Sequence, residues 1–366
     1  MHNPISIRDR IRGSLIGGGV GDALGYAVEF IGESGIFQKF GPGGITCYDL
    51  SPGGRALISD DTQMTLFTAN ALLFAFQREL ERGIPTNLSY CALHAYRAWY
   101  KTQLGPYNPE NRIPDDERGE TSFLLQDVAE LYHGRAPGLT CMSAIQKRST
   151  QLEDSVRITS FMQNKINDSK GCGGVMRVAP LGLAVQNWGW ERLAVEGAEL
   201  AAITHSHPLG YIPAACLSLI LNDIVYPRRN RSLQQIIERA RDRTADLFRD
   251  EPHVRYHTDL ITRAIELSKN KKSDLDNIQN LGQGWVAEET LAIAIYCSLK
   301  YQNDFSAAVI AAVNHQGDSD STGAVTGNIL GAWVGYDAIG EKWTANLELH
   351  DLIVSVADRL CNNLRT

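Results

Sequence analysis

The spacing of apolar residues along the chain predicts a mainly helical protein. After Asp61, apolar residues recur at steps of three and four positions, which places them on one helix face: Met64, Phe67, Ala71, Phe74 and Ala75. Residues 190–202 and 233–248 follow the same period. The strict alternation that is typical of a half-buried strand is scarce. The pattern therefore predicts an all-α protein.

Two stretches are apolar on almost every side, and three are rich in turn residues. Residues 286–299 and 307–313 are predicted to form central, fully buried helices. Turn residues gather in 32–54, 104–119 and 268–284, between predicted helices. None of these three has the composition of a flexible linker, and no tandem repeat occurs. We therefore expect a single domain over residues 1–366.

Glycine recurs at every fourth position in two segments. One stripe comprises Gly13, Gly17, Gly21 and Gly25, and the other comprises Gly323, Gly327, Gly331 and Gly335. A glycine inside a helix costs about 1 kcal/mol relative to alanine, which a closely packed neighbouring helix could offset. We expect both stripes to face tightly packed neighbours, with each other as candidate partners. The alternative for the first stripe is a segment that is partly loop.

Composition and charge narrow the class of protein. The 366 residues are 43% hydrophobic and 21% charged, which is typical of a globular chain rather than a disordered one. The net charge of −7 and the lack of a long basic run argue against general nucleic-acid binding. The apolar stretches are expected to be too short to span a membrane. The start, Met1-His2-Asn3-Pro4, lacks the features of a signal peptide.

The cysteines favour the cytoplasm. Seven are present, an odd number, and no two have the spacing of a zinc ribbon or a redox pair. The simplest interpretation is free thiols in a cytoplasmic protein.

Carboxylates gather at three predicted helix starts. Asp22 is followed seven residues later by Glu29, and the other two segments are Ser59-Asp60-Asp61-Thr62 and Gly317-Asp318-Ser319-Asp320-Ser321-Thr322. Helix capping accounts for one side chain at each start. Paired acids exceed that need, and two carboxylates about 4 Å apart repel by about 4 kcal/mol at an effective dielectric constant near 20. If the segments converge, they need cations, and all-oxygen ligands favour Mg²⁺ or Mn²⁺ over zinc.

Six motifs in a fixed order carry a family resemblance. They are Gly21-Asp22-Ala23-Leu24-Gly25 with Glu29-Phe30, Ser59-Asp60-Asp61-Thr62-Gln63-Met64, Gly171-Cys172-Gly173-Gly174-Val175-Met176-Arg177 with Pro180-Leu181-Gly182, Thr204-His205-Ser206-His207-Pro208, Gly282-Gln283-Gly284-Trp285 with Glu288, and Gly317-Asp318-Ser319-Asp320-Ser321-Thr322. Together they resemble the ADP-ribosylglycohydrolase family, from about residue 8 to about residue 362. The resemblance implies a compact, all-α, orthogonal helical domain with a binuclear magnesium site.

The resemblance also implies which residues hold the metal and carry out the reaction. The implied ligands of two Mg²⁺ ions, or of Mn²⁺ as the alternative, are Ser59, Asp60, Asp61, Asp318, Asp320 and Ser321. The implied catalytic residues are Asp60, Asp61, Asp318, Asp320 and Glu29, without a choice among the four aspartates for the proton transfer. Serine at positions 59 and 321 is similar to the arginine-specific members.

The same resemblance implies a substrate-binding set: Glu29, Gly171, Gly173, Gly174, Gln283, Gly284 and Trp285. Glu29 is expected at the substrate mouth. The glycines are expected to approach a diphosphate before a helix that starts at Val175, and an ordinary turn is the alternative. Trp285 lines the pocket or lies in the core.

Four other motif residues have structural interpretations beside the functional ones. Asp22 could simply hold backbone N–H groups. Arg177 either pairs with phosphates or forms a structural ion pair. His205 and His207 are read as a junction between a loop and a helix, because two-residue spacing does not suit a zinc pair.

These expectations combine into one predicted activity and two alternatives. The predicted activity is Mg²⁺-dependent hydrolysis of the bond between ADP-ribose and a modified protein side chain, with arginine as the expected linkage. One alternative is an immunity-type protein that binds and blocks a cognate ADP-ribosyltransferase, with hydrolysis secondary. The other is hydrolysis of a different ADP-ribose derivative. The expected partner is an ADP-ribosylated protein.

Overall fold

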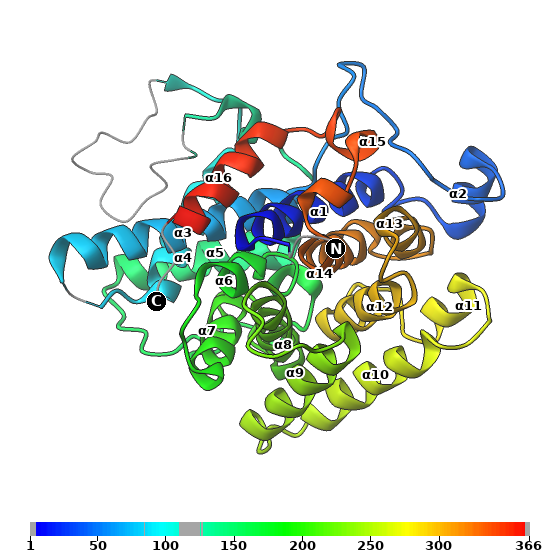
Figure 1. Ribbon diagram of the computed structural model, residues 1–366. Coiled ribbons are helices and arrows are strands. Elements are labelled where there is room, and N and C mark those ends of the chain that lie inside the picture. Colours follow the sequence, from blue (N-terminus) through cyan, green and yellow to red (C-terminus); the bar gives the residue numbers. More distant parts are fainter. Residues whose placement is uncertain (1–4, 84, 110–124, 126, 363–366) are drawn as a thin grey trace.

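The computed structural model describes residues 5–83, 85–109, 125 and 127–362, and helices are its regular elements (Figure 1). The α-helices are α1 (Ile7–Tyr26), α2 (Glu33–Phe40), α3 (Asp60–Arg82), α4 (Leu88–Thr102), α5 (Leu139–Glu153), α6 (Ala179–Ala184), α7 (Trp190–Ala202), α8 (Pro208–Val225), α9 (Leu233–Leu247), α10 (Val254–Leu267), α11 (Asp274–Gln279), α12 (Ala287–Lys300), α13 (Phe305–Val313), α14 (Ser319–Val334), α15 (Glu341–Thr344) and α16 (His350–Asn362). Short 3₁₀ helices are η2 (Ala129–Leu131), η3 (Cys172–Gly174) and η4 (Tyr336–Ala338). Within the described residues, β pairing is limited to two isolated bridges. The predicted all-α class is confirmed.

The centre of the fold is a close pair of helices, α1 and α14, which lie side by side in Figure 1. A Cβ atom on Gly17 would overlap the carbonyl oxygen of Gly327, and one on Gly21 would overlap that of Gly323. In turn, a Cβ atom on Gly327 would overlap the carbonyl oxygen of Gly17, and one on Gly323 would overlap that of Gly21. The glycine stripes therefore face each other, and the loss of side chains lets the two backbones touch.

Two details of the stripes differ from the alternatives considered above. The first stripe is helical throughout, because α1 continues to Tyr26, so a partial loop is wrong. Gly335 lies one residue beyond α14, with φ of +85°, where it ends the helix. Its glycine is therefore required by the backbone conformation of the helix end.

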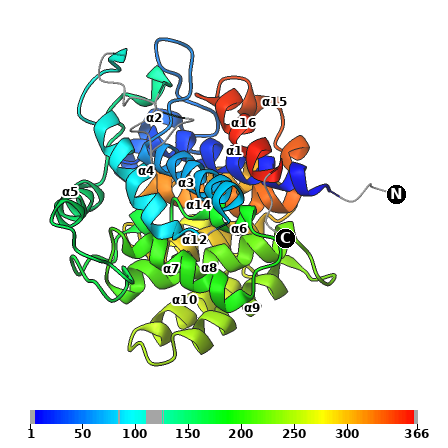
Figure 2. The ribbon, with the colours of Figure 1, turned by 90° about the vertical axis from the view of Figure 1, so that its left-hand side faces the viewer.

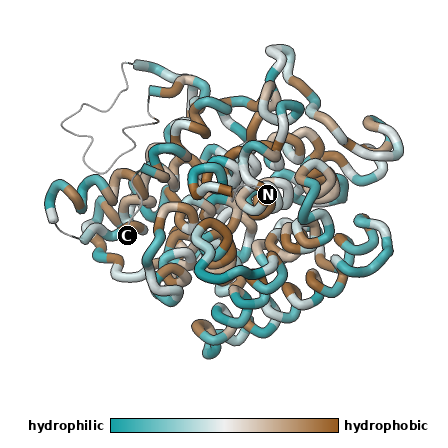
Figure 3. Tube along the Cα trace, viewed as in Figure 1, coloured by the Kyte–Doolittle hydropathy of each residue, from teal (hydrophilic) through white to brown (hydrophobic). Residues whose placement is uncertain are grey.

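Further helices surround this pair in two groups. α3, α13 and α16 pack on α1, whereas α8, α12 and α13 pack on α14. α9 and α10 form the outer layer at the lower edge of the molecule in both ribbon views (Figures 1 and 2). Apolar residues concentrate on the central helices, and polar residues follow the outer ones (Figure 3).

Helix α8 corrects the expectation about apolar stretches. It has 18 residues with a mean hydropathy of 1.5, so by length and composition it could cross a membrane. However, 94% of this helix is buried inside the fold, against α6, α7, α9 and α12. The helices expected at 286–299 and 307–313 are also present and largely buried, as α12 and α13.

The turn-rich segments contain helices that the sequence analysis missed. α2 lies within 32–54 and buries only Ile36, so it shows almost no apolar period. α11 lies within 268–284, and the Ser273 side chain caps it. Residues 110–119 of the third segment lie outside the described residues. The helix expected from Val175 begins four residues later, as α6.

Buried apolar side chains form one continuous cluster that extends from Ile11 to Leu360. All seven cysteines are free, as expected. The assignment of residues 1–366 to one domain stays a prediction.

Candidate active site at two acidic helix starts

Asp22 holds the start of α3 in place. It lies on α1 with no solvent exposure. Its carboxylate accepts hydrogen bonds from the Ser59 N–H at 2.9 and 3.1 Å, from the Thr62 N–H at 3.0 Å and from the Thr62 hydroxyl. The first N–H groups of a helix lack partners within the helix. The Asp22 carboxylate supplies acceptors for such N–H groups, so its observed contacts are structural.

The start of α3 presents one cap and two buried acids. The Ser59 hydroxyl oxygen accepts the Asp61 N–H at 3.2 Å, which is an N-cap contact. The Asp60 Oδ2 atom accepts the Gly138 N–H at 3.4 Å. The Asp61 Oδ2 atom is buried and has no hydrogen-bond partner among the described residues. These three side chains are 0 to 5% exposed, so capping accounts for only part of the polar groups here.

The start of α14 repeats this arrangement. Asp318 is the N-cap residue, and its carboxylate accepts the Ser321 N–H at 3.3 Å and the Cys172 thiol at 2.9 Å. The Asp320 Oδ1 atom accepts the same Ser321 N–H at 2.9 Å. Asp318, Asp320 and Ser321 are 1 to 3% exposed.

The two helix starts belong to neighbouring helices, because α3 and α14 pack on each other and both pack on α1. Burial raises the pKa of Asp60 and of Asp61 well above the usual range, and the next largest cause for both is the charge of Asp320. Asp320 is on the other helix. Burial and the same charge raise the pKa of Asp318. Carboxylates from α3 and α14 therefore share one low-dielectric region, in which the charge of Asp320 disfavours the ionisation of the other three.

Glu29 belongs to the same region. It lies in the turn after α1, and its Oε2 atom is buried with no hydrogen-bond partner in the part of the chain that the structure describes. Burial, followed by the charges of Asp320 and Asp318, raises its pKa. The segment of Asp22 and Glu29 is therefore not a helix start, as was expected, but the end of α1, and it brings Glu29 to the acids at the starts of α3 and α14.

The donor set fits a hard divalent cation. Among the described residues, no three His, Cys, Asp or Glu side chains already stand around one point as metal ligands. The unpartnered oxygens of Asp61 and Glu29, and the raised pKa values of the buried aspartates, both indicate missing positive charge. A bound divalent cation would supply that charge and lower the pKa values of its ligands. Carboxylate and hydroxyl oxygens suit Mg²⁺ or Mn²⁺.

Residues packed behind the glycine-rich loop at 171–174 leave no space for side chains at two of its glycines. A Cβ atom on Gly173 would lie 2.7 Å from the His205 ring, and one on Gly174 would lie 2.7 Å from the Ala201 Cβ. The N–H groups of Gly171 and Cys172 already donate to the Ser169 hydroxyl and to the Trp285 carbonyl. Packing inside the fold is thus sufficient to require glycine at two of the three predicted positions.

Arg177 holds this loop from within the fold. The side chain is 1% exposed. Its guanidinium donates to the carbonyl oxygens of Gly173 at 2.5 Å and Leu200 at 3.2 Å, and to the Thr204 hydroxyl at 2.7 Å. It also lies 4.4 Å from the centre of the Tyr96 ring. Its observed partners are therefore neutral groups, whereas an ion pair or a phosphate was expected.

The two motif histidines have separate structural roles. His205 is buried, its Nδ1 atom lies 2.9 Å from the Thr204 hydroxyl, and burial lowers its pKa to about 3. The His207 Nδ1 atom accepts the Leu209 N–H at 3.0 Å and caps α8. The predicted junction between a loop and a helix is confirmed.

The segment 283–285 links α14 to the glycine-rich loop. The Gln283 carbonyl oxygen accepts the Asp318 N–H at 2.9 Å. Gly284 has φ of +85°, and a Cβ atom there would lie 2.6 Å from the Thr322 methyl group. Trp285 is 42% exposed, so the core position considered above is wrong. Its exposed indole is available to a ligand.

Two residues near the site escaped the sequence analysis. The backbone carbonyl oxygen of Arg135 accepts the Asp60 N–H at 3.0 Å. The Arg135 guanidinium donates to the Glu348 carboxylate at 2.6 Å. The other Glu348 oxygen accepts the Ile58 N–H at 3.0 Å. This ion pair is 12% exposed on both sides and anchors the segment before α3. No sequence signal connects residues so far apart.

Comparisons with known proteins identify similar chains. The sequence profile of the ADP-ribosylglycohydrolase family matches residues 3–366. The ADP-ribosyl-[dinitrogen reductase] glycohydrolase of Rhodospirillum rubrum is 25% identical, over 94% of this chain and 92% of the relative. The ADP-ribosylarginine hydrolase Tri1 of Serratia proteamaculans is 23% identical, over 96% of this chain and 79% of the relative.

A solved structure also has this fold. It is described as an ADP-ribosylglycohydrolase-related protein complex, and the match has a TM-score of 0.65 and 22% identity. The match covers 98% of this chain and 99% of the solved chain. At that identity the likeness concerns the fold alone.

Proposed function

Because the chain belongs to the ADP-ribosylglycohydrolase family, we propose that it is a metal-dependent hydrolase that removes ADP-ribose from arginine side chains. The observation that carries the proposal is the group of buried carboxylates at the starts of α3 and α14, with oxygens that lack partners. A relative named for arginine-linked substrates supports the choice of linkage.

The metal ligands in this proposal are the six residues with carboxylate or hydroxyl oxygens at the two helix starts: Ser59, Asp60, Asp61, Asp318, Asp320 and Ser321. Two Mg²⁺ ions bound there, or Mn²⁺ in their place, would orient the ribose hydroxyls and stabilise charge that develops in the transition state. Asp22, Arg135 and Glu348 fix the backbone that presents these residues.

The reaction breaks the glycosidic bond between the anomeric carbon of the ribose and the guanidine nitrogen of arginine. A water oxygen forms the new bond to that carbon, and one water proton passes to a carboxylate among Asp60, Asp61, Asp318 and Asp320. The leaving guanidine takes up a proton, so the products are ADP-ribose and unmodified arginine. Positive charge on the sugar in an oxocarbenium-like transition state is favoured by a carboxylate-rich site.

The remaining residues of the set bind the substrate. Glu29, with an unpartnered oxygen, accepts charge-assisted hydrogen bonds from the guanidinium. The exposed Trp285 offers an aromatic face beside Gln283 and Gly284. The glycine-rich loop, through Gly171, Gly173 and Gly174, approaches the diphosphate.

The test is release of ADP-ribose from arginine-linked, serine-linked and nucleic-acid-linked substrates, with and without Mg²⁺. We expect the arginine linkage to be cleaved fastest, and no turnover in excess chelator. Comparable or faster cleavage of the serine linkage would overturn the specificity and leave the hydrolase intact. Full activity in chelator would overturn the metal mechanism. Stoichiometric inhibition of an ADP-ribosyltransferase without turnover would favour the binding-protein alternative.

A further inference from the structure

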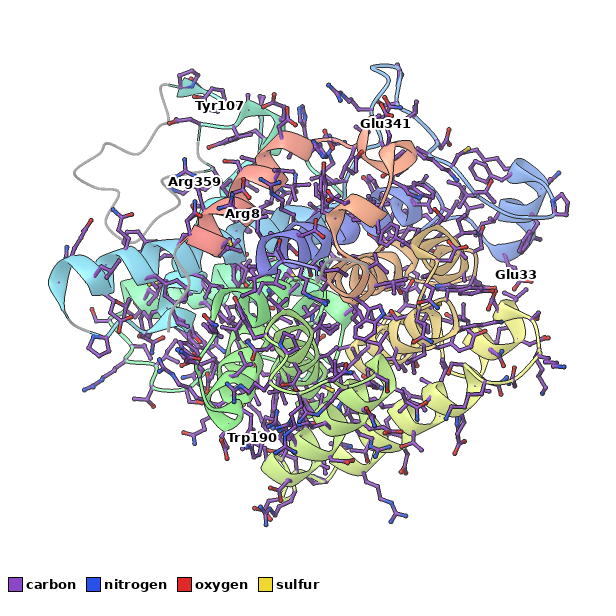
Figure 4. The ribbon with its side chains drawn as sticks, in the orientation of Figure 1. Arg8, Glu33, Tyr107, Trp190, Glu341 and Arg359 are labelled. Atoms are coloured by element: carbon purple, nitrogen blue, oxygen red, sulfur yellow. The ribbon has the colours of Figure 1, made fainter. Side chains whose placement is uncertain are left out.

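A second charged cavity lies at the edge of the molecule, on elements that the acidic site does not use. It has a volume of about 650 Å³. Its walls are the start of α7, the loop between α8 and α9, and one face of α9. Trp190 marks its position at the lower edge of the molecule in Figure 4. None of the proposed metal-binding or catalytic residues lines this cavity.

Four arginines line the cavity although the chain as a whole has a net charge of −7. Arg229 and Arg231 come from the loop, and Arg239 and Arg243 come from α9. This cluster does not form a long continuous basic run in the sequence, because the fold assembles it from two segments. On α9 the two arginines are four residues apart, so they lie on the same face.

The positive charge of the cluster is only partly compensated. Arg239 and Arg243 share one carboxylate, Asp223, at 3.7 and 3.8 Å. Among the residues that the structure describes, none forms a hydrogen bond or ion pair with the side chains of Arg229 and Arg231. The charges of Arg239, Arg228 and Arg231 add to burial in lowering the pKa of Arg243, which is the effect of neighbouring positive charges.

The acids of the same lining are directed to partners outside the cavity. Asp242 accepts a hydrogen bond from Arg241 at 2.8 Å, and Asp246 accepts one from Arg249 at 2.9 Å. Glu238 accepts one from the Gln234 amide at 2.6 Å. Each of these three carboxylates has a hydrogen-bond partner of its own, and their negative charge offsets part of the positive charge of the four lining arginines.

An aromatic ring completes the cavity. Trp190 is partly exposed at the start of α7, and the Arg243 guanidinium lies 5.2 Å from its ring centre. Guanidinium groups bind phosphate oxygens with two parallel hydrogen bonds, and an indole face stacks on planar rings. We propose that this cavity binds a small diphosphate-bearing ligand, held by the four arginines with Trp190 beside it.

The dimensions favour a small molecule. The lining stretch of α9, from Gln235 to Asp246, extends about 16 Å along the helix. That length matches a diphosphate with one attached group, whereas a nucleic-acid face needs a longer basic track. The two sources of this chemistry are an inorganic diphosphate and a nucleoside diphosphate, and the ring of Trp190 favours the nucleoside form.

The experiment measures binding of inorganic pyrophosphate and of adenosine diphosphate to the full-length protein in Mg²⁺ by calorimetry. The test variant is R229Q/R231Q, because these two side chains have no partner within the described part of the chain and their replacement should leave the fold intact. The matched control is R255Q/R263Q, which removes the same charge from exposed positions on α10 outside the cavity. Asp318→Asn reports binding at the acidic site instead.

We expect one equivalent of pyrophosphate to bind the wild-type protein. Because the variant removes two charge-assisted contacts to the phosphates, R229Q/R231Q should weaken binding at least about tenfold. R255Q/R263Q and Asp318→Asn should leave this binding unchanged. A Trp190→Ala change should weaken adenosine diphosphate more than pyrophosphate, and an equal loss would assign the ligand to the inorganic source.

Three results would overturn the proposal. The first is absence of binding at millimolar pyrophosphate. The second is equal weakening in R229Q/R231Q and R255Q/R263Q, which would indicate a general charge effect. The third is loss of binding only in Asp318→Asn, which would place the ligand at the acidic site. Binding of long polyanions without binding of pyrophosphate also contradicts a small-molecule cavity.

Discussion

The acidic helix starts and the arginine cavity both gather like charges, yet they do so in opposite surroundings. Asp60, Asp61 and Asp318 are 2 to 5% exposed, and no cationic side chain among the described residues pairs with them. Arg239 and Arg243 have side chains that are 30% and 16% exposed, and they lie beside a carboxylate. Water and salt screen the second cluster, whereas burial leaves the first to be neutralised by protons or by a cation. The effect of a group of like charges therefore depends more on where the charges lie than on how many there are.

The largest expected effect comes from removing one buried charge. Asp318→Asn should lower turnover by about 100- to 1000-fold, the loss typical of an electrostatic catalytic group. Asparagine keeps the N-cap contact of α14, so the melting temperature should change little. Single-turnover rates and thermal unfolding measure the two effects. Asp259→Asn, on an exposed part of α10, is the control and should leave both unchanged. Wild-type rates in the test variant would contradict the assignment.

The next effect tests whether the helix pair holds the acidic site together. A Cβ atom on Gly25 would overlap the Ser319 carbonyl at the start of α14. We expect Gly25→Ala to lower the free energy of unfolding by about 3 kcal/mol, because the backbone cannot yield. Turnover should also fall, since the acids of α14 move away from α3. Denaturant unfolding gives the value. Gly105→Ala, where the added atom meets nothing within 4 Å, should be nearly neutral.

The pH dependence of stability should separate the two clusters further. The pKa of Asp22 is raised by burial and by Asp320, from 3.8 to about 7. A carboxyl whose pKa is raised in the folded state keeps a proton that the same carboxyl releases in the unfolded state. Its stabilising contribution is therefore complete below pH 3.8 and is lost as the pH rises through about 7. In chelator, the melting temperature should fall across this window, and Mg²⁺ should flatten the profile. Parallel profiles would contradict a cation among these acids.

A smaller effect concerns recognition of the leaving group. Glu29→Gln should lower kcat/KM for arginine-linked ADP-ribose by about tenfold, because a charge-assisted hydrogen bond becomes a neutral one. Cleavage of the serine linkage, which presents no cation, should change less. Glu33→Gln is the matched control, since Glu33 accepts only an exposed amide contact at 3.2 Å. Equal losses on both substrates would assign Glu29 a role other than guanidinium recognition.

The smallest effect is expected at the arginine cavity. R229Q/R231Q should change the free energy of unfolding by less than about 0.5 kcal/mol, because neither side chain has a partner in the described ranges and both reach the surface. Denaturant unfolding in low and high salt measures this. A larger loss would mean that the arginines are structural, and the contrast between the two clusters would weaken.

Much of the architecture follows from local pattern. The four-residue period of glycine predicted the contact between α1 and α14, because only a bare helix face allows two backbones to touch. Serine and aspartate before apolar stretches predicted the starts of α3 and α14, since their oxygens bind free N–H groups. These signals lie within a few residues of each other.

Other features depend on segments that meet only in the fold. The apolar composition of α8 is that of a membrane helix, and only its neighbours show that it is a core helix. Trp285 and Trp343 are the same residue type, yet one is 42% exposed and the other 1%.

The sequence by itself determined the residue types available for chemistry: paired acids, hydroxyls and glycines in a fixed order. Tertiary structure decided their surroundings. It buried the acids against one another, anchored α3 with Arg135 and Glu348 from distant segments, and assembled four arginines from a loop and a helix. The physical reason is that burial and charge interaction depend on distance in space, and separation along the chain does not encode that distance.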